Sequence, residues 1–153
     1  KYQSEGGPGI VEIAGLLKGS DRPADDHRAL LKSQLLFWLI GAPDGHAKNF
    51  SVFLTPGGRY RLTPFYDVLT GQPAHDAGQI RRNRFKLAMS VGGHYRMDEV
   101  AGRHFVETAA RARIAPSLAT EVMADVQNTA AEAFDRVLEQ MPATFPEQLH
   151  ASV

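Results

Sequence analysis

The chain contains no cysteine. This absence excludes disulfide scaffolds, cysteine-ligated zinc and thiol chemistry, and it is compatible with a reducing compartment, so we expect a cytoplasmic protein. Long apolar runs are also missing: the longest is residues 35–42, far short of the ~20 residues that a membrane-spanning helix needs. No signal-peptide pattern opens the chain. We therefore expect no membrane partner.

What the chain does contain favours one folded domain. Its 153 residues are 43% hydrophobic and 22% charged, and eight Phe, four Tyr and one Trp can fill an interior. A chain of this length can bury a real core, so disorder as the dominant state is excluded. Because the sequence begins at Lys1 without Met, we expect that part of the protein lies upstream of it.

The net charge is zero, but the charges are unevenly distributed. Residues 81–113 hold eight basic and three acidic side chains, whereas residues 114–153 hold one basic and six acidic. Such asymmetry fits a surface for an anionic partner, such as an acidic protein surface or a DNA backbone. It equally fits neighbouring elements of opposite charge that face each other or solvent, and we favour this second interpretation.

Hydrophobic periodicity predicts a mainly α-helical fold with one short β-hairpin. Helices are expected over residues 10–17, from residue 25 or 26 to 40, over 97–115, and from 116 until Pro142, with residues 145–149 packing back. The last turn of the second helix, residues 36–40, is apolar all round and predicts burial. Residues 50–54 and 60–62 are expected to pair through the turn at 55–58. Residues 2–9 and 70–84 are expected to be loops.

The residues that suggest chemistry follow the second helix. Asp44 precedes Asn49 by five residues, and Asp67 follows eighteen residues later. Protein kinases use a catalytic-loop Asp, an Asn five residues on and a later Asp that binds metal. The order and spacing match. Asp and Asn are also common turn residues, however, and spacing alone favours a structural role, in which Asp44 and Asn49 cap a loop and Asp67 ends a strand.

The surroundings of Asp67 add weight to the chemical interpretation. This carboxylate lies in an apolar stretch, with Phe65 and Tyr66 before it and Val68 and Leu69 after it. Burying an unpaired carboxylate there is costly unless a metal ion or a donor compensates it. We therefore expect a buried Asp67 with a compensating partner.

Two stretches closely resemble the HipA family of bacterial serine/threonine kinases. Residues 39–51 read Leu-Ile-Gly-Ala-Pro-Asp-Gly-His-Ala-Lys-Asn-Phe-Ser, and residues 60–67 read Tyr-Arg-Leu-Thr-Pro-Phe-Tyr-Asp; residues 1–9 and 85–89 also look like family segments. The resemblance covers almost the whole chain. It implies that residues 1–153 form a protein-kinase-like C-terminal lobe whose N-terminal lobe is absent.

The resemblance also implies roles for particular residues. Asp44 matches the catalytic base, and Asn49 and Asp67 match the Mg²⁺ ligands that bridge the phosphates of ATP. His46 and Lys48 match the same loop, His46 as a residue that holds the loop by hydrogen bonds and Lys48 as one that can contact a phosphate. The nucleotide-cradling loop and the ATP-contacting lysine belong to the missing N-terminal part, so the chain alone is expected to be inactive.

The function implied by the resemblance is that of the toxin in a toxin–antitoxin pair linked to growth arrest and persistence. Such a kinase transfers the γ-phosphoryl group of ATP to a protein substrate, in this family an aminoacyl-tRNA synthetase. Its partner is a DNA-binding antitoxin of the HipB type, which connects it indirectly to DNA. Two alternatives stay open: a non-catalytic module that binds nucleotide or docks the antitoxin, and a helical regulator with a coincidental motif.

Overall fold

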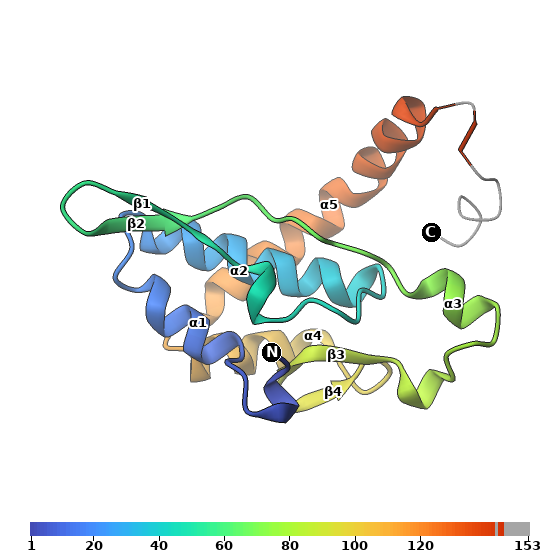
Figure 1. The fold of residues 1–153 in the computed structure, drawn as a ribbon, viewed down its shortest axis with the longest axis horizontal. Coiled ribbons are helices and arrows are strands. Elements are labelled where there is room, and N and C mark those ends of the chain that lie inside the picture. The colour runs from blue at the N-terminus through green and yellow to red at the C-terminus, as the bar shows by residue number, and fades with distance from the viewer. Residues whose placement is uncertain (143, 146–153) are drawn as a thin grey trace.

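The computed structural model describes residues 1–142, 144 and 145. Helices and short 3-10 turns dominate it, and two β-hairpins interrupt them (Figure 1). In chain order the elements are η1 Gln3–Glu5, α1 Ile10–Leu17, α2 Pro23–Leu39, η2 Ala47–Asn49, β1 Val52–Thr55, β2 Arg59–Leu62, α3 Gln72–Asp76, η3 Arg82–Arg84, β3 Lys86–Val91, β4 His94–Arg96, α4 Gly102–Arg111 and α5 Pro116–Gln140.

Helix α2 lies in the middle of the fold and contacts α1, α4 and α5. It begins with Pro23, whose missing N–H costs nothing at the first helical position. Asp25 and Asp26 follow in the first turn, where negative charge favours the helix. The core residues around it come from α1, α2, β3, α4 and α5 and include Leu17, Leu30, Met89, Val91, Ala109 and Val122.

The predicted hairpin is confirmed, with its strands shifted by one or two residues. Strands β1 and β2 pair antiparallel, and Phe53 lies opposite Arg61. Buried Asp26 on α2 accepts a hydrogen bond from the N–H of Leu62 at 3.2 Å. The hydroxyl of Tyr60 donates to the carbonyl of Leu16 on α1 at 2.6 Å. These two contacts hold the hairpin against the helices.

The prediction of a single hairpin is wrong, because β3 and β4 form a second antiparallel pair. Gly92 and Gly93 make its turn, both at positive φ, and a Cβ on Gly92 would lie 2.6 Å from His104. The register shifts between Lys86 and Val91, which hides the simple alternation that identifies a strand in a sequence.

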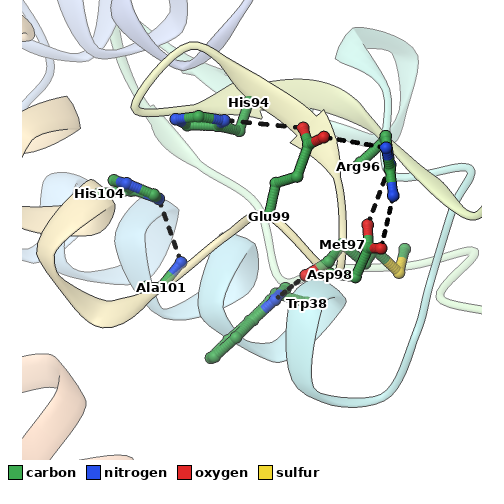
Figure 2. A network of polar contacts seen from close by, with 8 residues as sticks. All are labelled: Trp38, His94, Arg96, Met97, Asp98, Glu99, Ala101 and His104. Atoms are coloured by element: carbon green, nitrogen blue, oxygen red, sulfur yellow. Dashed lines mark hydrogen bonds and ion pairs between the residues drawn. The ribbon is translucent and has the colours of Figure 1, made fainter. Parts of the chain in front are cut away.

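The helix predicted over residues 97–115 is also wrong at its start, since α4 begins at Gly102. Figure 2 shows the polar network that holds the preceding segment out of a helix. Arg96 makes two hydrogen bonds to Asp98, at 2.6 and 3.1 Å, and an ion pair with Glu99 at 3.1 Å. The indole N–H of Trp38 on α2 donates to the carbonyl of Met97 at 3.0 Å. The local pairing of Arg96 and the long-range bond from Trp38 thus override the helical pattern.

Smaller corrections concern the remaining elements. The last turn of α2 is not fully buried: Leu36 is 39% exposed and Leu39 is 53% exposed. The expected loop 70–84 contains α3 and η3, and the expected loop 2–9 contains η1. Residues 146–149 of the expected C-terminal tail lie outside the described residues. Within the described chain, no helix combines the length and apolar character needed to cross a membrane.

The charge pattern finds a partial explanation between α2 and α5. Arg28 pairs with Glu121 and Lys32 pairs with Asp125, each at 2.7 Å. Two acidic side chains of residues 114–153 therefore face basic side chains of α2, whereas the basic residues 81–113 take no part in these pairs. The pairs are about half exposed, so solvent screens them and they add little to stability.

Candidate functional site

The predicted site lies mostly on the loop between α2 and β1, residues 41–51. Gly41 adopts the left-handed conformation with φ of 63°, and a Cβ there would lie 2.9 Å from the ring of Phe85. A Cβ on Gly45 would lie 2.3 Å from the ring of Phe37, a buried residue of α2. Because only glycine leaves this space, the loop rests directly on the core at both points.

Asp44 lies at an exposed turn of this loop and is held through one carboxylate oxygen. Its Oδ1 accepts a hydrogen bond from the Tyr2 hydroxyl at 2.5 Å. The same oxygen lies 3.5 Å from Nζ of Lys1 and 3.6 Å from Nε2 of His46. The hydrogen bond from Tyr2 is the main cause that lowers the pKa of Asp44 below its ordinary value. Its side chain is 51% exposed, so an ionised carboxylate is accessible from solvent.

The His46 side chain is buried next to Asp44. Among the described residues, its ring makes a packing contact and no hydrogen bond. The ring meets that of Tyr2 edge-on, with centroids 5.4 Å apart, and its Nδ1 has no hydrogen-bond partner among the described residues. The backbone N–H of His46 donates to Oδ1 of Asn49 at 3.0 Å. The hydrogen bond by which His46 holds the loop therefore comes from its backbone.

Asn49 connects the loop to Asp67. It is buried at the end of η2, and its Nδ2 donates to Oδ2 of Asp67 at 3.0 Å. Asp67 has φ of 56°, a left-handed conformation that Asp and Asn tolerate better than most residues. The expectation that Asp67 is buried is wrong, because its side chain is exposed. The apolar stretch packs through Phe65, whose ring meets that of Phe50 at 5.8 Å.

Lys48 and Tyr66 make a second connection between the loop at residues 41–51 and the segment that contains Asp67. The Tyr66 hydroxyl donates to the carbonyl of Lys48 at 2.8 Å and lies 2.6 Å from Oγ of Ser51. The side chain of Lys48 is exposed. Tyr66 therefore fixes the position of the loop relative to Asp67, a contact that the sequence does not indicate.

The side-chain oxygens of Asn49 and Asp67 suit Mg²⁺. This cation prefers oxygen ligands and commonly binds through one or two carboxylates and the phosphates of a substrate. Asp67 offers an exposed carboxylate. Asn49 presents its nitrogen to Asp67 and its oxygen to the N–H of His46, so the amide must turn before it can ligate a cation. No cluster of three or more His, Asp or Glu side chains in the described chain could hold a metal ion. The residues thus fit a cation that arrives with phosphate oxygens.

The structure brings four of the five predicted residues into one chain of contacts. Asp44 approaches His46, His46 bonds Asn49 through its backbone, and Asn49 bonds Asp67. Lys48 belongs to the same loop, but no described contact joins its ammonium group to the others. Sequence reasoning missed Tyr2 as a neighbour of Asp44, because nothing in the spacing indicates a contact across 42 residues.

A hollow of about 270 Å³ lies against Tyr2 and Pro43, the residue before Asp44. The second hairpin supplies its other side through Lys86 and Tyr95. The hollow therefore lies between the N-terminal segment, the loop and the second hairpin.

The comparisons with known proteins agree with the resemblance in the sequence. A family model described as HipA-like C-terminal domain matches residues 1–138. A protein of Sinorhizobium fredii named "Putative kinase Y4mE" is 31% identical over 140 residues, which cover 91% of this chain and 32% of that protein.

Among solved structures, a HipA chain in the complex of the Shewanella oneidensis toxin–antitoxin proteins HipA and HipB with operator DNA is similar in fold. Its TM-score is 0.77 at 19% sequence identity, and the match covers 94% of this chain and 32% of that chain. The chain therefore spans about a third of the length of both relatives.

Proposed function

Because this chain belongs to the family of HipA-like C-terminal domains, we propose that the protein containing it is an ATP-dependent serine/threonine protein kinase. It transfers the γ-phosphoryl group of ATP to the hydroxyl of a serine or threonine in a protein substrate. Since the chain spans 32% of its relatives, the activity belongs to the longer protein, whose N-terminal part supplies the loop and the lysine that hold ATP.

The observation that carries this proposal is the contact chain from Asp44 through His46 and Asn49 to Asp67. Phosphoryl transfer needs little covalent chemistry from the protein and depends mainly on positioning and on neutralising charge. At one end of this series of contacts, the Asp44 carboxylate can position the acceptor hydroxyl. At the other end, the Asn49 amide and the Asp67 carboxylate can hold a cation that neutralises charge. The 3.6 Å approach of His46 to Asp44 and the two hydrogen bonds of Asn49 connect the two ends.

Asp44 acts on the acceptor hydroxyl. Like an ordinary aspartate, it is ionised at neutral pH, so it can accept a hydrogen bond from the hydroxyl and direct the hydroxyl oxygen toward the phosphorus. As the phosphoryl group transfers, Asp44 accepts the hydroxyl proton. A carboxylate with a low pKa is a weak base, and orientation is therefore the larger part of its contribution.

Asn49 and Asp67 are proposed to hold Mg²⁺ at the phosphates, with Lys48 and His46 on the same loop as parts of the nucleotide site. When bound, the cation supplies positive charge to the phosphate oxygens. The chain contributes the exposed carboxylate of Asp67 and, after its amide turns, the oxygen of Asn49. Tyr66 keeps the loop and the Asp67 segment together during binding.

The proposed biological role is that of a toxin controlled by an antitoxin, with growth arrest and persistence as the result. The similar Shewanella protein is in complex with HipB and operator DNA. On that basis we propose a DNA-binding antitoxin of the HipB type as the partner, and DNA as an indirect one. An aminoacyl-tRNA synthetase is the proposed substrate class.

The test of the kinase assignment uses the full-length protein. Asp44→Asn keeps the shape of the side chain and removes its charge, so transfer from labelled ATP should fall by at least roughly a hundredfold. Asp135→Asn is the matched control, because Asp135 is exposed on α5 and should leave the rate unchanged.

Two outcomes would contradict the assignment. Wild-type transfer in Asp44→Asn would show that Asp44 is not the catalytic carboxylate. A wild-type protein that binds nucleotide or antitoxin without transferring phosphate would instead support the alternative, a non-catalytic binding module.

A further inference from the structure

All described contacts of the Asp44 carboxylate fall on the same oxygen. Oδ1 receives the hydrogen bond from Tyr2 and is the atom nearest to Lys1 and His46. The Tyr2 hydroxyl makes the shortest of these contacts, at 2.5 Å, against 3.5 Å for Nζ of Lys1 and 3.6 Å for Nε2 of His46. Within the described chain, Oδ2 therefore remains available to another molecule.

Tyr2 is itself held firmly in place. Its carbonyl accepts hydrogen bonds from the N–H groups of Glu5 and Gly7, at 3.1 and 2.9 Å. The next residue, Gln3, accepts two bonds from Ser90 on β3, at 2.7 and 3.0 Å. A Cβ on Gly7 would lie 2.8 Å from the carbonyl oxygens of Lys1 and Tyr2, so the tight turn leaves no room for a side chain there. The tyrosine thus projects from a segment that is fastened to the second hairpin.

The ring of Tyr2 adds a second constraint. It packs edge-on against the ring of His46, whose side chain is buried. The hydroxyl therefore reaches Asp44 from a ring that is fixed on one side by His46 and at its backbone by η1. Such support is what a precisely placed functional group requires.

From this arrangement we infer that Tyr2 is a positioning residue for phosphoryl transfer: its hydroxyl anchors Oδ1 of Asp44 and thereby presents Oδ2 to the acceptor hydroxyl. The inference rests on the proposed function. It assigns the N-terminal segment a direct part in the reaction, although that segment lies 42 residues from the loop.

The test is Tyr2→Phe in the full-length protein, which removes the hydroxyl and keeps the ring against His46. Without the anchor Asp44 samples other rotamers, so kcat should fall on the order of tenfold or more, while KM for ATP stays unchanged. Tyr95→Phe is the matched control, because Tyr95 lines the same hollow and no described contact joins it to Asp44. It should behave like the wild type.

A pH profile distinguishes positioning from a general loss of structure. The charged and titratable groups facing Asp44 are Lys1, Tyr2 and His46, and the Tyr2 hydroxyl is the main cause of the low pKa of Asp44. Removing it should raise that pKa toward its ordinary value. The acidic limb of kcat against pH should therefore move to higher pH in Tyr2→Phe and stay in place in Tyr95→Phe. A carbon-detected NMR titration of the Asp44 carboxyl should show the same direction without turnover.

The possible failures are distinguishable. If Asp44→Asn is inactive but Tyr2→Phe has the wild-type kcat and acidic limb, the positioning role is wrong and the kinase assignment stands. If Tyr2→Phe is faster than the wild type, the tyrosine blocks the carboxylate, which also overturns the inference. If Asp44→Asn retains full activity, the kinase assignment itself fails, whatever Tyr2→Phe does.

Discussion

Both carboxylates of the site are tied through one oxygen and exposed to solvent. Oδ1 of Asp44 accepts from Tyr2, and Oδ2 of Asp67 accepts from Asn49. In the part of the chain that the structure describes, the side-chain hydrogen bond to each carboxylate falls on that one oxygen. A carboxylate fixed in this way keeps its orientation and still offers a ligand or acceptor atom, which is what positioning a phosphate and a hydroxyl requires.

The left-handed backbone of Asp67 yields a prediction about stability. Asn tolerates this conformation and its side-chain oxygen can replace the acceptor for Asn49, so Asp67→Asn should change the free energy of unfolding by less than about 0.5 kcal/mol. Asp67→Ala loses the acceptor and meets a backbone penalty of about 1–2 kcal/mol. Urea denaturation of both variants measures the difference. Equal destabilisation by the two would show that the charge, rather than the backbone, matters at this position.

At the scale of elements, helices and strands with a regular hydrophobic pattern could be predicted from the sequence. Elements whose conformation departs from the local pattern could not. Helix α1, most of α2 and the start of α5 at Pro116 follow from apolar spacing and proline placement. The β3–β4 hairpin was not predicted from the sequence, because its second strand has only three residues and its register shifts. The segment after it was predicted as helix because the sequence gives no sign of the hydrogen bond from distant Trp38 to Met97 or of the local pairing of Arg96 with Asp98.

The close contact between the site loop and α2 gives a prediction at the same scale. A Cβ on Gly45 would collide with Phe37, so Gly45→Ala should destabilise the protein by about 1–3 kcal/mol through displacement of the loop or the ring. The matched substitution, Gly15→Ala, faces open space on α1 and should stabilise by about 0.5–1 kcal/mol. Thermal melts should therefore shift in opposite directions, and a shared direction would mean that the loop is not seated on α2 as described.

Over the whole molecule, the site combines three segments that meet around the end of α2. The order and spacing of Asp44, Asn49 and Asp67 were enough to predict that they share a site, because short loops on consecutive elements keep them near each other. Their contacts and exposure could not be predicted from the sequence. Asp67 faces solvent although its neighbours are apolar. The N-terminal segment is bonded to the second hairpin through Gln3 and contacts Asp44 through Tyr2. Sequence distance hides such contacts.

The central claim is that one site divides two tasks, with Asp44 acting on the acceptor and Asp67 holding the cation at ATP. Calorimetric titration of ATP, with and without Mg²⁺, into the full-length wild type, Asp44→Asn and Asp67→Asn tests this division most directly. Asp44→Asn should bind Mg·ATP like the wild type. Asp67→Asn should bind at least roughly tenfold more weakly, about 1.4 kcal/mol, and lose its dependence on Mg²⁺. Wild-type, Mg²⁺-dependent binding by Asp67→Asn would contradict the account.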